Sequence, residues 1–544
     1  MYDALNVLVN DEGLLYRRGG GAYFIATNSG SSPVGLADVH TSAGQRTLVW
    51  DDSGNLRVWN GSAWVTIYSG SGGPKAEPFR VVAIPDGVAI LSAFNGEWLS
   101  YYGSLKSSAY NTGTVTVSAG STTVTGVGTS WLANVDAGMF FQAPVGGFSQ
   151  RRVARVNSDT SLELRTPASG ALAGSTYTAG VAGGSSIPPA GQALGSFPLS
   201  LASVGSPARL VAGFANRAYF SERGRGGIAS AEDYHELPTS ETIIGADAIE
   251  DTAFLFTTGG VWAISNMAFD PVDAYGNIQH VVQEASKDLI LWGDPGIAAR
   301  EGGFIVPAVD DVYAWAPGNA MAPLTARIRP LYRSYVAAGY RPGVAAVHRS
   351  HYFLPILNGN TKVDMLVCRL DRDAAWTRFD GMASSTAYAQ RVGASTRQPK
   401  LLGLTAQRVT DLSGCFDPTG SNAFDGDNTL VTGDVVTRDF PTGQQPGFVQ
   451  RARVRYEMED GGTPDPTVTL AFSSDQDGGT FTDLTERGEL GGAAGWATSD
   501  GSTYQWALVG KRRERIRFRV RVTGVCSRFV LRSIELLTRP QGKQ

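Results

Sequence analysis

The stretch RTLVWDDSGNLRVWNGSAWVTIY, residues 46–68, decides the fold class. Apolar residues alternate with polar ones in three short runs, and a period of two is that of a β-strand. The clusters DSGN at 52–55 and NG at 60–61 separate the runs. Gly and Asn tolerate the left-handed backbone conformation that tight hairpin turns require. The stretch therefore predicts a meander of antiparallel strands.

The same pattern recurs along the chain, first in FRVVAIPDGVAILSAFNGEWLSYY at 79–102. It returns after residue 195 in ARLVAGFANRAYFSE at 208–222, ETIIGADAIEDTAFLFTTGGVWAIS at 241–265, GGFIVPAVDDVYAWAPGNAMAPL at 302–324 and GVAAVHRSHYFLPIL at 343–357. The units recur about every 40–60 residues, which is the spacing of propeller blades. This spacing favours a β-propeller over a stacked sandwich, although the units share a pattern and not a sequence.

The overall composition agrees with an all-β fold. The chain has 544 residues, of which 18% are charged and 10% aromatic, and it contains 67 glycines. A disordered chain would be rich in charge and poor in aromatic residues. Many Gly, Thr, Val and aromatic residues with few strong helix formers indicate short strands joined by tight turns. The length suffices for about three to four domains.

A segment of different amino-acid composition interrupts the blade pattern. Thr, Val and Ser alternate in NTGTVTVSAGSTTVTGVGTSWLANV at 111–135, and GGSSIPPAGQALG at 183–195 resembles a linker back to the propeller. We predict an inserted β-barrel or sandwich module at 104–189, which splits the propeller into 1–103 and 190–410. The remainder, 411–544, predicts a C-terminal β-sandwich, either separate or also closing the propeller.

Charge and cysteine content limit the partners and the compartment. A net charge of -4 predicts no strong bulk attraction to nucleic acid or to an anionic membrane. No run of about 18 apolar residues occurs, so no membrane insertion is expected. The start, MYDALNVLVNDEGLLYRRGG, lacks the pattern of a secretory signal. Three widely separated cysteines, Cys368, Cys415 and Cys526, fit a chain that folds in a reducing compartment without disulfides.

The sequence contains no nucleophile elbow, zinc-protease helix, P-loop or dinucleotide-binding motif. His348 and His351 lie in a predicted strand that points them to opposite faces, without a third metal ligand nearby, so we predict surface or interface positions. His235 is predicted in a loop between blades, and no nucleophile accompanies it. We therefore expect that the protein is not an enzyme and has no catalytic residue, metal site or cofactor.

The stretch SSDQDGGTF at 473–481 resembles the Asp-box hairpin of sialidase-type propellers. Asp477 and Gly479 have the spacing of that motif, but Phe481 comes one residue early and Asp475 replaces a Ser. An Asp-box is a structural turn and not an active site. A calcium loop is disfavoured because no Glu follows at the twelfth position.

The C-terminal region contains an arginine ladder, which we define as Arg515, Arg517, Arg519 and Arg521 in KRRERIRFRVRV at 511–522. In a strand these side chains share one face, and the apolar residues between them share the other. A one-residue shift in register would bury four guanidinium groups, so the apolar face fixes the register. We favour a face that pairs with acidic residues, either across a subunit boundary or within the chain (Glu457, Glu459, Asp460), over a contact with DNA.

Several motifs, taken in their order along the chain, resemble the tail hub or nozzle proteins of short-tailed bacteriophages, also described as packaged-DNA stabilisation proteins. They are NVLVNDEGLLYRRGGGAY at 6–23, the middle blades around DYHELP and GGFIVPAVDDVYAW, and the C-terminal run from VTRDF to RRERIRFRVRVTG. In that run Gly488, Glu489 and the arginines of 513–521 fall in matching places, whereas Phe481 stands for Trp and 495–504 carries extra residues. The inserted segment resembles a β module that recurs in phage neck and tail proteins.

This resemblance implies a structural virion protein. Six copies would form a ring below the portal and the head-to-tail adaptor, extend the DNA channel, retain the packaged genome and anchor tail spike or fibre and plug proteins. Double-stranded DNA would pass through without sequence recognition, and mild acidity suits such a channel because a basic lining would grip phosphates. Folding and assembly would take place in the host cytoplasm before incorporation into the virion tail. The alternative is a glycan-binding or sialidase-like propeller of a phage tail.

Overall fold

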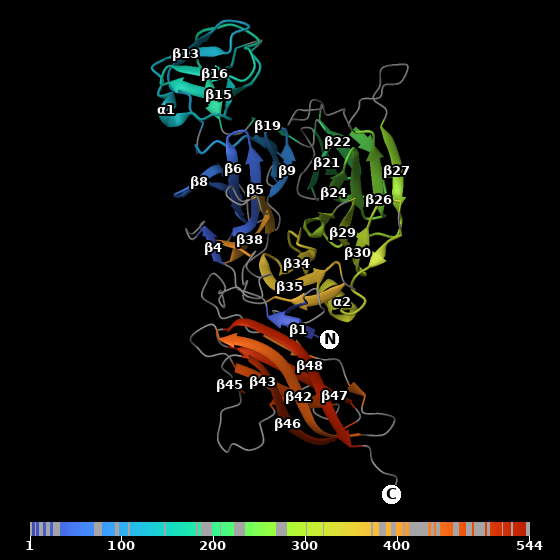
Figure 1. The fold of residues 1–544 in the computed structure, drawn as a ribbon. Helices are drawn as coiled ribbons and strands as arrows, with labels where there is room; N and C mark the ends of the chain where they lie inside the picture. The colour runs from blue at the N-terminus through green and yellow to red at the C-terminus, as the bar shows by residue number, and fades with distance from the viewer. Residues whose placement is uncertain are drawn as a thin grey trace.

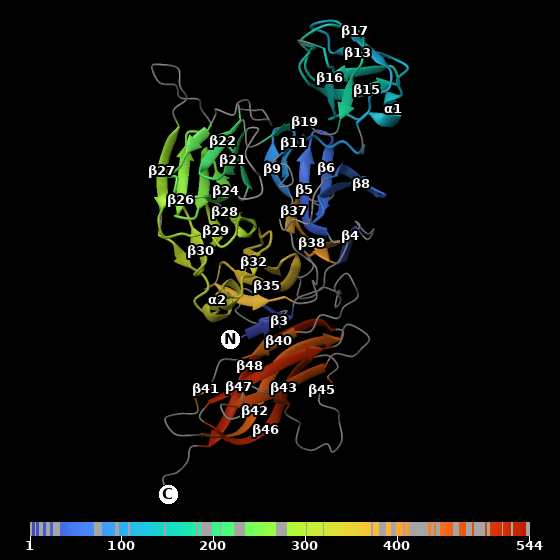
Figure 2. The same cartoon turned by 180° about the vertical axis from the view of Figure 1, so that it is seen from behind.

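The computed structural model describes residues 3–5, 7–9, 15–17, 22–25, 33–69, 79–92, 97–106, 109–145, 148–180, 183–186, 199–206, 208–221, 234–267, 280–300, 302–318, 320–371, 374–379, 388–392, 399–405, 408–412, 433–436, 440–441, 447–460, 467–474, 481–483, 496–497, 501–513, 515–523 and 526–539. The fold is a β-propeller with an inserted β module and a C-terminal β-sandwich, which confirms the predicted fold class. The module and the sandwich lie at opposite ends of the propeller (Figures 1 and 2).

Seven antiparallel blades form the propeller within the described residues; six are separate four-stranded sheets, and the sixth blade along the chain is part of a larger sheet. Blade one contains β5 (Pro33–Thr41), β6 (Gly44–Asp51), β7 (Asn55–Trp59) and β8 (Trp64–Ser69). Blade two contains β9 (Phe79–Ile84), β10 (Gly87–Ser92), β11 (Glu97–Tyr101) and β19 (Gly183–Ser186). Blade three contains β20 (Leu199–Val204), β21 (Arg209–Phe214), β22 (Arg217–Phe220) and β23 (Tyr234–Glu236). Blade four contains β24 (Ile243–Ile249), β25 (Thr252–Thr257), β26 (Val261–Ser265) and β27 (Val281–Ser286).

The last three blades complete the ring. Blade five is β28 (Ala298–Arg300), β29 (Gly303–Pro307), β30 (Val312–Trp315) and β31 (Ala322–Pro323), preceded by the 3-10 turn η1 (Asp294–Gly296) and followed by α2 (Arg329–Ala337). Blade six is β32 (Arg341–Pro342) and β33 (Ala346–His348), which both pair with β34 (His351–Asn358), then β35 (Thr361–Arg369) and β36 (Ala375–Arg378). Blade seven is β37 (Tyr388–Val392), β38 (Pro399–Thr405), β39 (Arg408–Asp411) and the N-terminal strand β4 (Ala22–Ile25).

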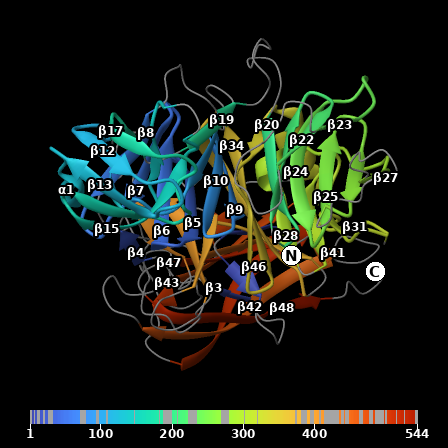
Figure 3. The ribbon, with the colours of Figure 1, turned by 90° about the horizontal axis from the view of Figure 1, so that it is seen from above.

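Contacts between the first strands of neighbouring blades close the ring. Strand β9 packs against β5 and β20, β20 against β24, β28 against β33, and β37 against both β33 and β5. Strands β5, β9, β20 and β24 follow one another across the view in Figure 3. Blades four and five share an apolar core that joins Phe254 and Phe256 to Phe304 and Trp315. Because β4 completes blade seven, an N-terminal strand closes the propeller, and not the region after 411.

The inserted module follows β11 and precedes β19. It contains β12 (Thr114–Val117), β13 (Thr123–Val127), α1 (Trp131–Asn134), β14 (Phe140–Gln142), β15 (Arg151–Ser158), β16 (Ser161–Leu164), β17 (Leu172–Ser175) and β18 (Thr178–Gly180). Its core centres on the fully buried Trp131, whose indole N–H donates to the Tyr177 hydroxyl over 2.7 Å. The stretch Gly183–Ser186, predicted as linker, is instead the fourth strand of blade two, since it pairs with β11.

Ionic, aromatic and hydrogen-bonding contacts hold the module against the propeller. Asp86, in the turn between β9 and β10, forms ion pairs with Arg152 and Arg165 of the module. The Arg152 guanidinium lies 4.1 Å from the centre of the Tyr102 ring. The Leu105 amide donates to the Asp136 carboxylate over 3.0 Å.

Deleting 108–182 and bridging the ends with a short Gly/Ser linker should leave a folded propeller. Ser100 and Gly183 are register partners on adjacent strands, so the ends of the insertion lie side by side. Exposed ion pairs such as those of Asp86 contribute little, so we expect the melting temperature to fall by no more than about 5 °C. Circular dichroism and calorimetry would measure this, and aggregation of the shortened chain would contradict the insertion.

The C-terminal sandwich has two sheets that enclose one apolar core. The first holds β1 (Asp3–Leu5), β40 (Gly433–Val436), β41 (Phe440–Pro441), β43 (Thr467–Ser474), β44 (Thr482–Asp483), β45 (Trp496–Ala497) and β47 (Arg515–Thr523). The second holds β2 (Val7–Val9), β3 (Leu15–Arg17), β42 (Gly447–Asp460), β46 (Gly501–Arg513) and β48 (Cys526–Arg539). Val454, Leu470 and Phe518 meet between the sheets.

The first strands of the chain belong to the sandwich, which corrects their assignment to the propeller. Strand β1 pairs antiparallel with β40 and parallel with β36, so blade six and the first sandwich sheet form one continuous sheet. Strand β3 pairs with β48 in the second sheet. The propeller and the sandwich are therefore joined by hydrogen-bonded strands as well as by the chain.

Candidate functional site

Strand β47 carries the arginine ladder on the outer face of the first sandwich sheet. Ile516, Phe518, Val520 and Val522 are buried in the sandwich core, as the alternation predicts. Arg517, Arg519 and Arg521 are half-buried on the other face. Arg515 begins the strand, and its side chain lies outside the described part of the structure.

Two ladder residues have neighbours that sequence reasoning did not identify. Asp434 is the register partner of Arg521 on β40, and its carboxylate accepts from the Arg521 Nη2 over 2.7 Å and from Nε over 3.2 Å. The Arg519 guanidinium lies 5.0 Å from the centre of the Phe481 ring, in cation–π geometry. The ladder therefore lies beside an acidic and an aromatic partner of its own subunit.

Glu457, one of the acids that the sequence analysis considered beside the ladder, forms an ion pair with Arg532. It lies on β42 in the other sheet, where its carboxylate accepts from the Arg532 Nη2 over 2.7 Å. Glu459 and Asp460 also belong to β42, and their side chains lie outside the described part of the structure. Among the described side chains, Asp434 is an intramolecular acid that pairs with the ladder.

His348 and His351 occupy buried positions that the sequence did not suggest. His348 and His351 are register partners at the β33–β34 turn and are 2% and 7% exposed, so their predicted surface position is wrong. His235 lies on strand β23 and not in a loop between blades. Burial lowers the pKa of His348 to about 4, and burial also lowers the pKa of His351.

A buried Arg–His–His chain links blades three and four. Arg209, only 1% exposed, places its Nη1 at 2.9 Å from the His280 Nε2, and the His280 Nδ1 lies 2.9 Å from the His235 Nε2. Because a guanidinium can only donate, His280 accepts at Nε2 and donates from Nδ1 to His235. The Phe220 ring stacks on His235 with centroids 5.1 Å apart. Burial, followed by the charges of His280 and Arg209, lowers the pKa of His235 to about 4.

Stability should fall as the pH is lowered from 6.5 towards 4. The unfolded chain protonates His235 and His348 near pH 6.5, whereas the folded protein takes up these protons only near pH 4. The free energy of unfolding at pH 5 should therefore decrease by about 1–2 kcal/mol per histidine, after allowance for partial exposure. Asp247 opposes this, because burial raises its pKa to about 6 and the folded state then gains a proton.

Urea unfolding at pH 7 and pH 5 would measure the effect. The variant His235→Asn should lose part of the pH dependence, and Ala63→Asn, at an exposed position without a titratable group, should keep all of it. An unfolding free energy that rises towards pH 5 in the original protein would contradict the assignment.

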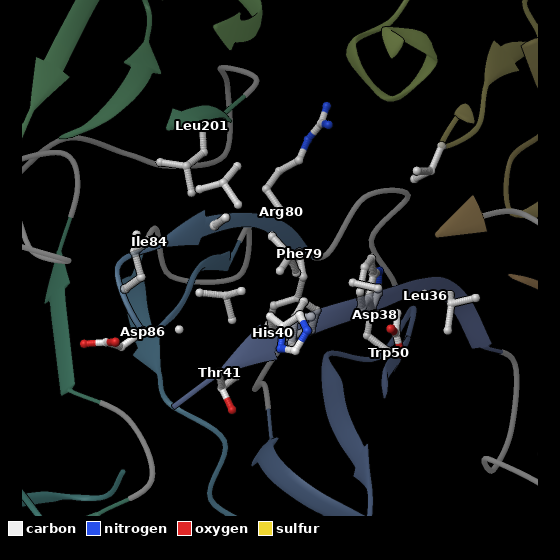
Figure 4. Close-up of a pocket in the computed structure, with 18 of the residues that line it drawn as sticks. Leu36, Asp38, His40, Thr41, Trp50, Phe79, Arg80, Ile84, Asp86 and Leu201 are labelled. Atoms are coloured by element: carbon white, nitrogen blue, oxygen red, sulfur yellow. The ribbon is translucent and has the colours of Figure 1, made fainter. Parts of the chain in front are cut away.

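Ionic and polar side chains also meet near the propeller axis. Arg80, on the first strand of blade two, forms an ion pair with Asp294, at the start of η1 beside blade five. The Arg80 charge also acts on Asp247 of blade four. This ion pair connects blade two with the turn that precedes blade five. Arg80 also lines a cavity of about 630 Å³ beside the first strands of blades one, two and three (Figure 4).

The described residues contain no group of three or more His, Cys, Asp or Glu side chains that could hold a metal ion. The Cys368 thiol is buried and free, and burial raises its pKa. The turn of the Asp-box resemblance, 475–480, and Cys415 lie outside the described residues. Within the same described ranges no helix is long and apolar enough to cross a membrane.

No family model and no curated protein matches the sequence. Solved propellers are similar in fold. The BBS1 N-terminal domain in complex with ARL6 is 11% identical and covers 72% of this chain and 96% of its own, with a TM-score of 0.35. The Neurospora crassa Pan2 WD40 domain is 9% identical and covers 73% of this chain and 94% of its own, with a TM-score of 0.33. A putative oxidoreductase (glucose dehydrogenase) from Thermus thermophilus is 11% identical and covers 72% of this chain and 99% of its own, with a TM-score of 0.27.

Proposed function

We propose that this chain is a structural subunit of a short phage tail, a hub or nozzle that forms a ring around the DNA channel and is not an enzyme. The sequence resemblance supplies the family. The observation that best supports the proposal is the build of the subunit, in which two additional β units project from opposite ends of a propeller (Figures 1 and 2). Such a subunit offers separate surfaces to its neighbours in a ring, to the adaptor, and to spike and plug proteins.

The attachment of the sandwich fits a load-bearing role, because it shares a continuous sheet with blade six. The module is attached more weakly, by the exposed Asp86 ion pairs and by the Tyr102 contact. A tail subunit has to keep its surfaces in fixed relative positions while DNA pressure acts on the ring, and hydrogen-bonded joints meet that requirement better than flexible linkers do.

We assign the arginine ladder to a contact between subunits. Arg517 and Arg519 bring two positive charges to a half-buried face, where acidic residues of a neighbouring copy would bind them at a partly desolvated interface. Interfaces of this kind weaken as the salt concentration rises.

The double variant Arg517→Gln with Arg519→Gln should weaken ring assembly by about tenfold or more, with a reduced salt dependence. Arg532→Gln, which removes an exposed arginine paired with Glu457 inside its own subunit, is the matched control and should assemble normally. Native mass spectrometry at low and high salt would measure the assembly. Normal rings in particles that leak their genome would place the ladder against DNA and overturn the assignment.

The alternative function is glycan binding or cleavage by a sialidase-like propeller. It is supported only by the Asp-box resemblance at 473–481. Cleavage of host polysaccharide by the purified chain, lost on substitution of one acidic residue, would favour this alternative over the structural role.

A further inference from the structure

The buried Arg–His–His chain joins three separate parts of the sequence at the outer side of the propeller. His235 lies on β23 and His280 directly precedes β27, and these are the outermost strands of blades three and four (Figure 3). Arg209 begins β21 of blade three. Through its two contacts of 2.9 Å, the chain fastens the outer edge of blade three to the start of the outermost strand of blade four.

The directions of the hydrogen bonds fix how many protons this chain can hold. The Arg209 guanidinium only donates, so the His280 Nε2 accepts and the His280 Nδ1–H donates to the His235 Nε2. Each imidazole is therefore neutral, with its proton on Nδ1. An added proton has to enter at an Nε2 atom, because that atom carries the basic lone pair of its ring. There it would bring two donors face to face and break one of the two hydrogen bonds.

The surroundings of the chain oppose such a proton. Arg209 and His280 are only 1% and 8% exposed. The Phe220 ring packs against both imidazoles, with centroids 5.1 Å from His235 and 5.2 Å from His280. Burial, followed by the charges of His280 and Arg209, lowers the pKa of His235 to about 4. A proton taken up in acid therefore favours any state in which the chain is broken.

The carboxylate next in sequence does not offset a charge on His235. Glu236 pairs with Arg217 of β22 at 3.5 Å. Because successive side chains of a strand point to opposite faces, Glu236 and His235 lie on different faces of β23. The charge of a protonated His235 would thus add to that of Arg209 without a paired acid on its own strand.

Strand β23 can separate at low cost. It is three residues long, and among the described strands it pairs only with β22. Short segments at the edge of a sheet open with a smaller free energy than the whole domain. The inner strands of blades three and four share an apolar core that includes Val211, Ile243 and Leu255, and these side chains do not titrate.

We propose that the Arg–His–His chain is an acid-sensitive latch, in which a proton on His235 or His280 releases β23 and the start of β27 from each other while the inner strands of both blades stay folded. At neutral pH the latch is closed. The inference requires no ring and is therefore independent of the proposed tail function.

Hydrogen–deuterium exchange of the full chain at pH 7 and pH 5, corrected for the intrinsic effect of pH on exchange, tests the latch. A histidine with a pKa near 6.5 when released and about 4 when latched should raise the opening equilibrium of β23 and of the start of β27 by about tenfold or more at pH 5. Strand β6 of blade one, which contains no histidine, should lose clearly less protection.

The double variant His235→Gln with His280→Gln tests the role of the protons. A glutamine side chain can accept at its carbonyl and donate from its amide, so it can keep the direction of the hydrogen bonds, and it takes up no proton at pH 5. We expect β23 in this variant to be equally protected at pH 7 and pH 5. Arg217→Gln, which removes the neighbouring ion pair and leaves the latch, is the matched control and should keep the acid response.

Three results would overturn the proposal. The first is that β23 keeps its full protection at pH 5 in the original chain, and the second is that β6 loses as much protection as β23. The third is that the double glutamine variant responds to acid as the original does. The first two are measured on the unmodified protein, so they decide the matter even where the double variant does not fold.

Discussion

Replacing Leu5 by proline should uncouple the C-terminal sandwich from the propeller. Leu5 is the register partner of Arg378 on one side and of Asp434 on the other, so β1 is the strand that joins blade six to the sandwich sheet. A proline there removes the backbone N–H inside a central strand, a position that sheets exclude proline from because the ladder loses a hydrogen bond. The joined sheet links the two parts together with an apolar cluster that includes Val530 of β48 and Phe353 of β34. Because the variant breaks the joined sheet, we expect the two parts to unfold separately.

Differential scanning calorimetry would measure the uncoupling as one thermal transition that splits into two, with the sandwich melting first. Leu5→Val keeps the backbone N–H and suits a strand, so it is the matched control and should unfold as the original does. A single unshifted transition in Leu5→Pro would show that β1 does not hold the parts together.

The variant Arg209→Met should be among the most destabilising single substitutions in the propeller. Arg209 is 1% exposed and is the donor that fixes the proton positions of His280 and His235. The substitution leaves the buried His280 Nε2 without this hydrogen-bond donor. It also removes the Arg209 guanidinium, which lies 5.3 Å from the centre of the Phe220 ring. We expect a loss of about 2–4 kcal/mol in the free energy of unfolding.

Arg217→Met is the control in the same blade. Arg217 is a partly exposed arginine that pairs with Glu236 at 3.5 Å, and such surface pairs contribute about 0–1 kcal/mol. Urea unfolding at pH 7 would compare the two variants. An equal, small loss in both would contradict the role of the buried Arg–His–His chain.

Local pattern was sufficient to predict the blades, because each blade is a meander of neighbouring strands. In β7, Leu56 and Val58 are buried and Arg57 is half-buried, as the alternation predicts. The turn at 60–61 lies where NG predicts it, with the Asn60 side chain accepting from the Ser62 and Ala63 amides.

Pairings between distant parts of the chain were beyond that pattern. The local sequence of 3–17 does not show that its strands pair with strands after residue 430. The Gly/Ser composition of 183–186 suggests a linker, but these residues form a strand because they pair with β11. Sequence alternation placed Arg517, Arg519 and Arg521 on one face, but it could not identify Asp434, which lies more than 80 residues earlier. The burial of His348 likewise depends on how blades pack against each other.

The most direct test of the structural role is cryo-electron microscopy of the purified full chain. The account predicts rings with an open central channel, six subunits in each by the resemblance, with sandwich and inserted module at opposite ends of every subunit. Particles that remain monomeric, or trimers without a channel, across protein and salt concentrations that favour assembly would contradict it.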